Sequence, residues 1–248
     1  MKKLSCIIML FALFTVSAQE EAELGRQIAA SIERGMPIYR DMEYEKRIMR
    51  VGYNLAGVCD RKDINYTFTI IDRDEINGFA TFGGYIYIYK GAMDKAETDD
   101  ELAAIIAHEI GHVSAKHLAK RLEQDRTFSF SFGLLDTFVL RKQKSRRDIH
   151  KIVNISYGII QRGYTLQDEY EADRLGTRYC YRAGYDPLAA VTLLNKLKKE
   201  ERRAGASTIF ENIDILRTHP YIDERIDTII SETGAIKAEE AYEKSGNK

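Results

Sequence analysis

The sequence of 248 residues has no tryptophan, few prolines and cysteines (three of each), and no marked excess of either charge. Its 37 basic and 38 acidic residues leave a net charge of −1. A general nucleic-acid binder would carry a strong basic excess, so nucleic acid is not expected as a partner. Because 44% of the residues are hydrophobic, the chain can bury a core. It is therefore neither a disordered tail nor a low-complexity polymer.

The first 18 residues differ in composition from the rest. Lys2 and Lys3 precede a short apolar run, and small residues follow it up to Ala18. This order predicts a signal peptide over 1–18, which makes the protein exported, with the periplasm as the main expectation and a secreted or membrane-associated protein as the alternative. The run is shorter than the roughly 20 residues that span a membrane, so a retained anchor is the less favoured interpretation.

Without this segment the chain keeps two cysteines, Cys59 and Cys180. An even number permits one disulfide in an oxidising compartment, and two buried thiols are the alternative. No linker or repeat divides residues 19–248, which predicts a single domain whose charged tail, from about residue 232, is expected to be frayed.

Apolar spacing predicts helices between residues 20 and 58, interrupted near Gly35 and Pro37. Residues 64–72 and 79–89 are rich in β-branched and aromatic side chains, which predicts two strands joined by a turn. One helix is expected from about Asp99 to Leu122, and another between Thr165 and Gly184. The fold class expected is α+β, mostly helical with a small sheet.

His108, Glu109 and His112 form the pattern H-E-x-x-H inside the first of these helices. The two histidines lie about 40° apart on one helix face, so both imidazoles can reach one metal ion. Glu109 lies about a quarter-turn away, where it can act on a water molecule beside the ion without becoming a ligand. This arrangement predicts a zinc hydrolase with one Zn²⁺ per chain. Two solvated histidines on a surface helix are the alternative, which the apolar neighbours disfavour.

A catalytic zinc needs a third protein ligand. In a continuous helix His117 would lie about 140° around from His112 and would face away from the ion. Glu169 and Asp173 share one face of the later helix, so we assign Glu169 as the third ligand and Asp173 as the acceptor that supports a ligand imidazole. Glu171 would point in the opposite direction. A solvated acidic face is the alternative for this cluster.

Five blocks of the sequence resemble peptidase family M48, the HtpX-like and Oma-like zinc metallopeptidases, and most closely its soluble periplasmic members. The blocks are NGFATFGGYIYIYKGAM, ELAAIIAHEIGHVSAKH, DEYEADRLG, AGYDPLAAV and THPYIDERI. The resemblance covers nearly the whole chain after residue 18. It implies zinc on His108, His112 and Glu169, with Glu109 catalytic and Asp173 supporting, which agrees with the spacing argument.

The strand that contains Gly84, Tyr85, Ile86 and Tyr87 is expected to be an exposed edge above the metal helix, where its backbone would pair with an extended substrate. An interior strand is the alternative.

His219 and Arg225 are placed near the active site by the resemblance. Our hypothesis is that one of them approaches the oxygen at the metal, either to stabilise the oxyanion or to block the open coordination position in a resting state. A surface histidine is the alternative.

Residues 127–147 combine an apolar stretch with basic residues, and we favour a hairpin that covers the active site over a peripheral membrane contact. The function expected is that of a zinc endopeptidase. Its partners would be polypeptides, and the resemblance implies misfolded or unassembled cell-envelope proteins. A periplasmic chaperone or binding protein that keeps a zinc site with little turnover is the alternative, and another type of zinc hydrolase is a weaker one. No oligomeric state is indicated.

Overall fold

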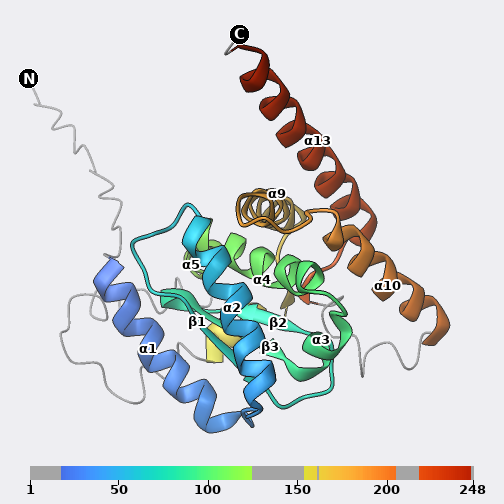
Figure 1. The fold of residues 1–248 in the computed structure, drawn as a ribbon. Coiled ribbons are helices and arrows are strands. Elements are labelled where there is room, and N and C mark those ends of the chain that lie inside the picture. Colours follow the sequence, from blue (N-terminus) through green and yellow to red (C-terminus); the bar gives the residue numbers. More distant parts are fainter. Residues whose placement is uncertain (1–17, 125–153, 161, 205–217, 247–248) are drawn as a thin grey trace, which may run out of the picture.

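The computed structural model describes residues 18–124, 154–160, 162–204 and 218–246 (Figure 1). The predicted signal peptide and the predicted hairpin at 127–147 lie outside these residues, apart from Ala18, which begins the first helix. The elements are α1 (Ala18–Gly35), α2 (Met42–Val58), β1 (Thr67–Ile71), β2 (Gly78–Ala80), η1 (Phe82–Gly84), β3 (Tyr85–Tyr89), α3 (Lys90–Lys95), α4 (Asp99–Ser114), α5 (His117–Gln124), α9 (Leu166–Arg182), α10 (Ala189–Ala204) and α13 (Ile222–Gly246). Residues 154–160 are also helical. The expected α+β class, mostly helical with a small sheet, is confirmed.

The sheet has three strands in the order β1-β3-β2. β3 runs parallel to β1 and antiparallel to β2. The second expected strand is split in two because Gly83 and Gly84 adopt positive φ angles of 74° and 84°, which form a tight turn between β2 and β3.

The expectation that Gly84, Tyr85, Ile86 and Tyr87 form an exposed edge is therefore wrong. The last three residues belong to the central strand, whose backbone is hydrogen-bonded to a neighbour on each side, and Gly84 belongs to the turn. The edge strand that packs against α4 is β2.

The two faces of the sheet enter different parts of the core because side chains alternate along a strand. Ile86 and Ile88 pack with residues of α2 and α4. Tyr87 and Tyr89 point to the other face, which residues of α1 and of the helical stretch 154–160 cover. With both faces covered, the sheet is a fixed support for the α4 helix.

The α4 helix carries the H-E-x-x-H pattern through the core. Thr98 caps its first turn by accepting a hydrogen bond from the backbone N–H of Glu101. The helix ends at Ser114, eight residues before the expected end at Leu122. Lys116 has a left-handed φ of 57°, and a separate helix, α5, begins at His117.

The α9 helix begins at the predicted place, with a capping box between Thr165 and Asp168. It packs closely on α4 because glycines face the partner backbone from both helices. A Cβ at Gly111 would lie 2.6 Å from the carbonyl oxygen of Ala172, and a Cβ at Gly176 would lie 3.1 Å from the backbone of Ala107. This close approach positions the acidic face of α9 over the histidines of α4.

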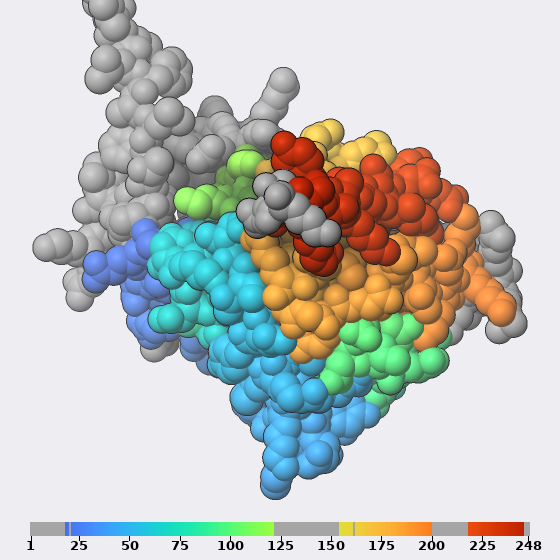
Figure 2. Space-filling model, turned by 45° about the horizontal axis from the view of Figure 1, so that its top comes forward, coloured from blue at the N-terminus to red at the C-terminus, as the bar shows by residue number. Residues whose placement is uncertain are grey.

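The expectation of a frayed tail from residue 232 is wrong, because α13 continues as a helix to Gly246. Arg178 of α9 forms ion pairs with Glu232 and Glu239 on α13. Figure 2 shows α13, in red, lying against the orange surface of α9 and α10.

Cys59 and Cys180 are buried and are not joined, which agrees with the thiol alternative. Among the described residues, we find no helix with both the length and the apolar character needed to cross a membrane.

Candidate metal centre

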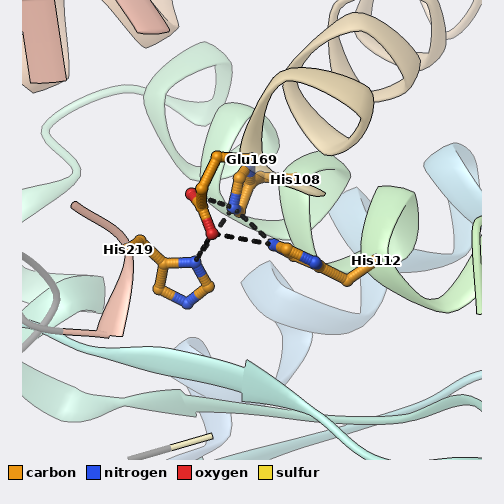
Figure 3. Close-up of side chains that lie close together, drawn as sticks. All are labelled: His108, His112, Glu169 and His219. Atoms are coloured by element: carbon orange, nitrogen blue, oxygen red, sulfur yellow. Dashed lines mark hydrogen bonds and ion pairs between the residues drawn. The ribbon is translucent and has the colours of Figure 1, made fainter. Parts of the chain in front are cut away.

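The two histidines of α4 and one carboxylate of α9 meet in the core (Figure 3). The Nε2 atoms of His108 and His112 are 2.9 Å apart. Glu169 Oε2 lies 3.4 Å from His108 Nε2, and Glu169 Oε1 lies 3.5 Å from His112 Nε2. All three predicted ligands therefore direct a donor atom toward one point.

His219 reaches the same point from the stretch just before α13. Its Nδ1 atom lies 3.1 Å from Glu169 Oε1 and 3.1 Å from His108 Nε2. Each of the four residues His108, His112, Glu169 and His219 offers one ligand atom within 4.8 Å of the others, and all four are buried. The structure thus places His219 among the candidate ligands.

The donor set fits a zinc ion. Three imidazoles and one carboxylate are the ligand types that zinc takes in a four-coordinate site. Glu169 Oε2 is buried without a hydrogen bond in the described part of the chain, although such groups are normally satisfied. Two imidazole nitrogens 2.9 Å apart beside a carboxylate converge on one point, where a cation would interact with all three groups.

Asp173 and Arg225 support this set from behind. Asp173 Oδ1 is 2.8 Å from His108 Nδ1, the contact that a supporting acceptor makes. Arg225 donates to both oxygens of Asp173, at 2.7 and 2.8 Å, and its Nη1 lies 3.3 Å from Glu169 Oε2. Arg225 thereby holds two carboxylates in place.

The buried charges shift the acidities of these groups. Burial alone would raise the pKa of Glu169, but His219 and Arg225 hold that pKa well below its usual value. Burial opposes ionisation of Asp173 as well, yet Arg225 and His108 lower its pKa. Both carboxylates are therefore ionised at neutral pH and can balance the charge of a cation.

Glu109 lies next to this set without joining it. Its side chain is about 2% exposed, and its Oε1 is 3.5 Å from His219 Nε2. Its Oε2 is buried without a hydrogen bond in the described residues. A carboxylate that borders the ligand set through His219, with one oxygen that makes no hydrogen bond in the described residues, is available for proton transfer.

An apolar recess adjoins Glu109 and His219. Leu193, Leu194 and Leu197 of α10 line it together with Ile229 of α13. This composition suits a nonpolar side chain next to the reacting groups.

Two neighbours of His112 were not foreseen. His117 was expected to face away, but its Nδ1 is 2.8 Å from His112 Nδ1, because the helix ends at Ser114 and the left-handed Lys116 turns the chain back. His117 is absent from the four-residue set, as expected. Tyr164 stacks on His112 with ring centroids 4.0 Å apart. No spacing in the sequence could have placed Tyr164 there, since it lies before α9 and outside any helical period.

Comparison with known proteins gives a consistent result. The model of peptidase family M48 matches residues 42–233. The beta-barrel assembly-enhancing protease of Escherichia coli strain K12 is 29% identical over 216 residues, which cover 86% of this chain and 43% of that protein. The putative beta-barrel assembly-enhancing protease of Vibrio cholerae is 30% identical over 216 residues, with 86% and 44% covered.

A mitochondrial relative is also similar. The mitochondrial metalloendopeptidase OMA1 of Schizosaccharomyces pombe is 27% identical over 196 residues, which cover 78% of this chain and 54% of that protein. The chain spans less than half the length of the first two relatives.

Proposed function

Because the chain belongs to peptidase family M48, we propose that it is a zinc-dependent endopeptidase that uses the centre at His108, His112 and Glu169. The observation that carries the proposal is the convergence of these three side chains on one point, with Glu109 beside them and outside the ligand set. A zinc ion held there supplies Lewis-acid polarisation of the scissile carbonyl and of water.

Glu109 performs the proton transfers. As a water molecule attacks the carbonyl carbon, the carboxylate of Glu109 accepts a proton from that water. When the C–N bond breaks, Glu109 gives the same proton to the leaving amine nitrogen. The products are a carboxylic acid and an amine, the acid then passes its proton to the amine at neutral pH, and Glu109 is returned to its starting state.

Arg225 and Asp173 act through the ligands. Asp173 accepts a hydrogen bond from Nδ1 of His108 and so leaves Nε2 free to bind metal. Arg225 fixes Asp173 and Glu169 at their observed separations. A change in either residue should therefore act on metal affinity as well as on turnover.

In the resting state His219 would be a fourth ligand to a metal held by the other three residues and would block access to it. Its Nδ1 lies among the ligand atoms, and its side chain is about 1% exposed. A substrate carbonyl needs this position, so His219 must move away before cleavage.

The substrates are unfolded or unassembled polypeptides of the cell envelope. Support comes from the relatives named for beta-barrel assembly and from the signal-peptide pattern at residues 1–18, which indicates export to the periplasm. The edge strand β2 packs against α4 and its residues are buried, so an extended chain would pair with β2 only after this edge is uncovered. The intact Glu109 argues against a pure chaperone, since binding alone needs no general base.

The test compares the wild type with Glu109→Gln on an unfolded protein substrate, each with and without a chelator. We expect cleavage by the metal-loaded wild type alone and about one zinc per chain in both proteins, lost on His108→Ala. Equal cleavage by all samples would refute the proposal, and undiminished binding without cleavage by the wild type would support a chaperone instead.

A further inference from the structure

The break between α4 and α5 brings two imidazole rings together on the side of His112 that faces away from Glu169. His112 Nδ1 and His117 Nδ1 are 2.8 Å apart. The side chains are 1% and 0% exposed. At this distance one buried nitrogen must donate a hydrogen bond and the other must accept it, because two lone pairs or two N–H groups would repel each other.

The direction of this hydrogen bond follows from the proposed metal site. Nε2 of His112 faces Glu169 and His108, so Nε2 is the metal-binding nitrogen and the neutral ring carries its proton on Nδ1. His117 Nδ1 is then the acceptor, and the proton of His117 lies on Nε2. That Nε2 atom is 3.2 Å from Glu171 Oε2, which accepts the hydrogen bond.

The two ligand histidines of α4 are thus held differently. His108 donates directly to a buried carboxylate, Asp173. Nδ1 of His112 donates to the neutral imidazole of His117. His117 in turn donates to the carboxylate of Glu171, which lies on the exposed side of α9. Glu171 does point away from the metal position, as the helical period predicts, and this direction brings it to His117.

We propose that His117 and Glu171 are positioning residues that fix the ring orientation and the tautomer of the metal ligand His112. The inference rests on the proposed metal site and adds residues to it. It also gives a role to the left-handed Lys116, because a continuous helix would carry His117 about 140° around from His112. The break at Lys116 makes the contact geometrically available.

The experiment separates the hydrogen bond from packing by comparing His117→Leu with His117→Asn in the full chain. Leucine fills much of the ring volume but accepts no hydrogen bond, whereas the amide oxygen of asparagine can take the position of Nδ1. Zinc affinity is measured by competition with a chromophoric chelator. We expect the dissociation constant to rise by about 10- to 100-fold in His117→Leu and to stay near the wild-type value in His117→Asn.

Glu171→Ala keeps the core intact because it changes a partly exposed side chain, and we expect it to weaken zinc binding less than His117→Leu. Nitrogen NMR of the zinc-loaded wild type should show the His112 proton on Nδ1, and Glu171→Ala should broaden or shift that signal.

The inference is overturned if His117→Leu binds zinc as tightly as the wild type, or if His117→Asn is as weak as His117→Leu. A wild type that binds no zinc would instead refute the proposed function.

Discussion

Replacing Gly111 with alanine should separate α9 from α4 and weaken the metal centre. An added Cβ would lie 2.6 Å from the carbonyl oxygen of Ala172 and 3.0 Å from its Cα. An unstrained carbon–oxygen contact is about 3.3 Å, so α9 must retreat by about 0.7 Å. Ala172 directly precedes Asp173, whose 2.8 Å contact with His108 would lengthen to about 3.5 Å, beyond hydrogen-bond range.

The energetic consequences have two parts. Overpacking of a buried contact costs about 1–3 kcal/mol. Alanine recovers up to about 1 kcal/mol of helix propensity relative to glycine. We therefore expect Gly111→Ala to lower the free energy of unfolding of the metal-free protein by up to about 2 kcal/mol. Zinc affinity should fall by about 10- to 100-fold, as when a supporting contact is lost.

Urea denaturation and chelator competition measure these two effects. Gly234→Ala is the matched control, because Gly234 is an exposed helical residue of α13 and a Cβ there would meet no atom within 4 Å. This control should gain about 0.5–1 kcal/mol in stability and leave zinc affinity unchanged. If Gly111→Ala were as stable as the wild type and bound zinc equally well, close helix packing would not be what positions the ligands.

Zinc affinity should decrease by about tenfold per pH unit below pH 9, because zinc must displace the proton of His108. Burial and Arg225 lower the pKa of this imidazole, but Asp173 raises that pKa to about 9 in the metal-free protein. Calorimetric titrations that show the same zinc affinity at every pH would contradict the prediction. His219→Ala should raise the turnover of an unfolded substrate and weaken zinc binding. A fall in turnover would instead show that His219 stabilises the oxyanion. Unchanged turnover would exclude both the blocking role and the oxyanion role. Thr165→Ala should lower the free energy of unfolding by about 1 kcal/mol in urea, because it removes the N-cap of α9, and an unchanged midpoint would show that the cap is dispensable.

The candidate ligands His108, His112 and Glu169 were predictable from local rules about helix faces. Thr98 and the acidic first turn of α4 predict where that helix begins, and the helical period then places His108 and His112 on one face. The same period puts Glu169 and Asp173 together on α9. These relations hold within single helices, whereas the meeting of α9 with α4 was inferred from the need for a third ligand and from the family resemblance.

The end of α4 was not predictable because tertiary contacts determine it. Nothing in Ala115, Lys116 or His117 excludes a helix from the sequence alone. The break is stabilised by Arg61, which comes from a distant loop and donates to the carbonyl oxygen of Val113 at 3.1 Å. The contact between His117 and His112 lies on the other side of the turn.

Long-range pairing explains the two other wrong predictions, the exposed edge at residues 84–87 and the frayed tail from residue 232. The alternation in β3 predicts a strand but does not say how many neighbours it has, and β1 pairs with it in parallel from outside the β2–β3 hairpin. The charged composition of α13 suggested fraying, yet Arg178 binds Glu232 and Glu239, and Ile236 is buried. Only the folded arrangement supplies these partners.

The candidate ligands come from three segments that lie far apart in the sequence, on α4, on α9 and just before α13. Neither a partly synthesised chain nor one with α9 undocked can assemble the set. Metal capture by the three proposed ligands therefore requires α9 to be docked on α4, and the proposed peptidase activity can begin only after these helices have packed. The wide separation of the candidate ligands thus ties the proposed metal site to the folded state of the chain.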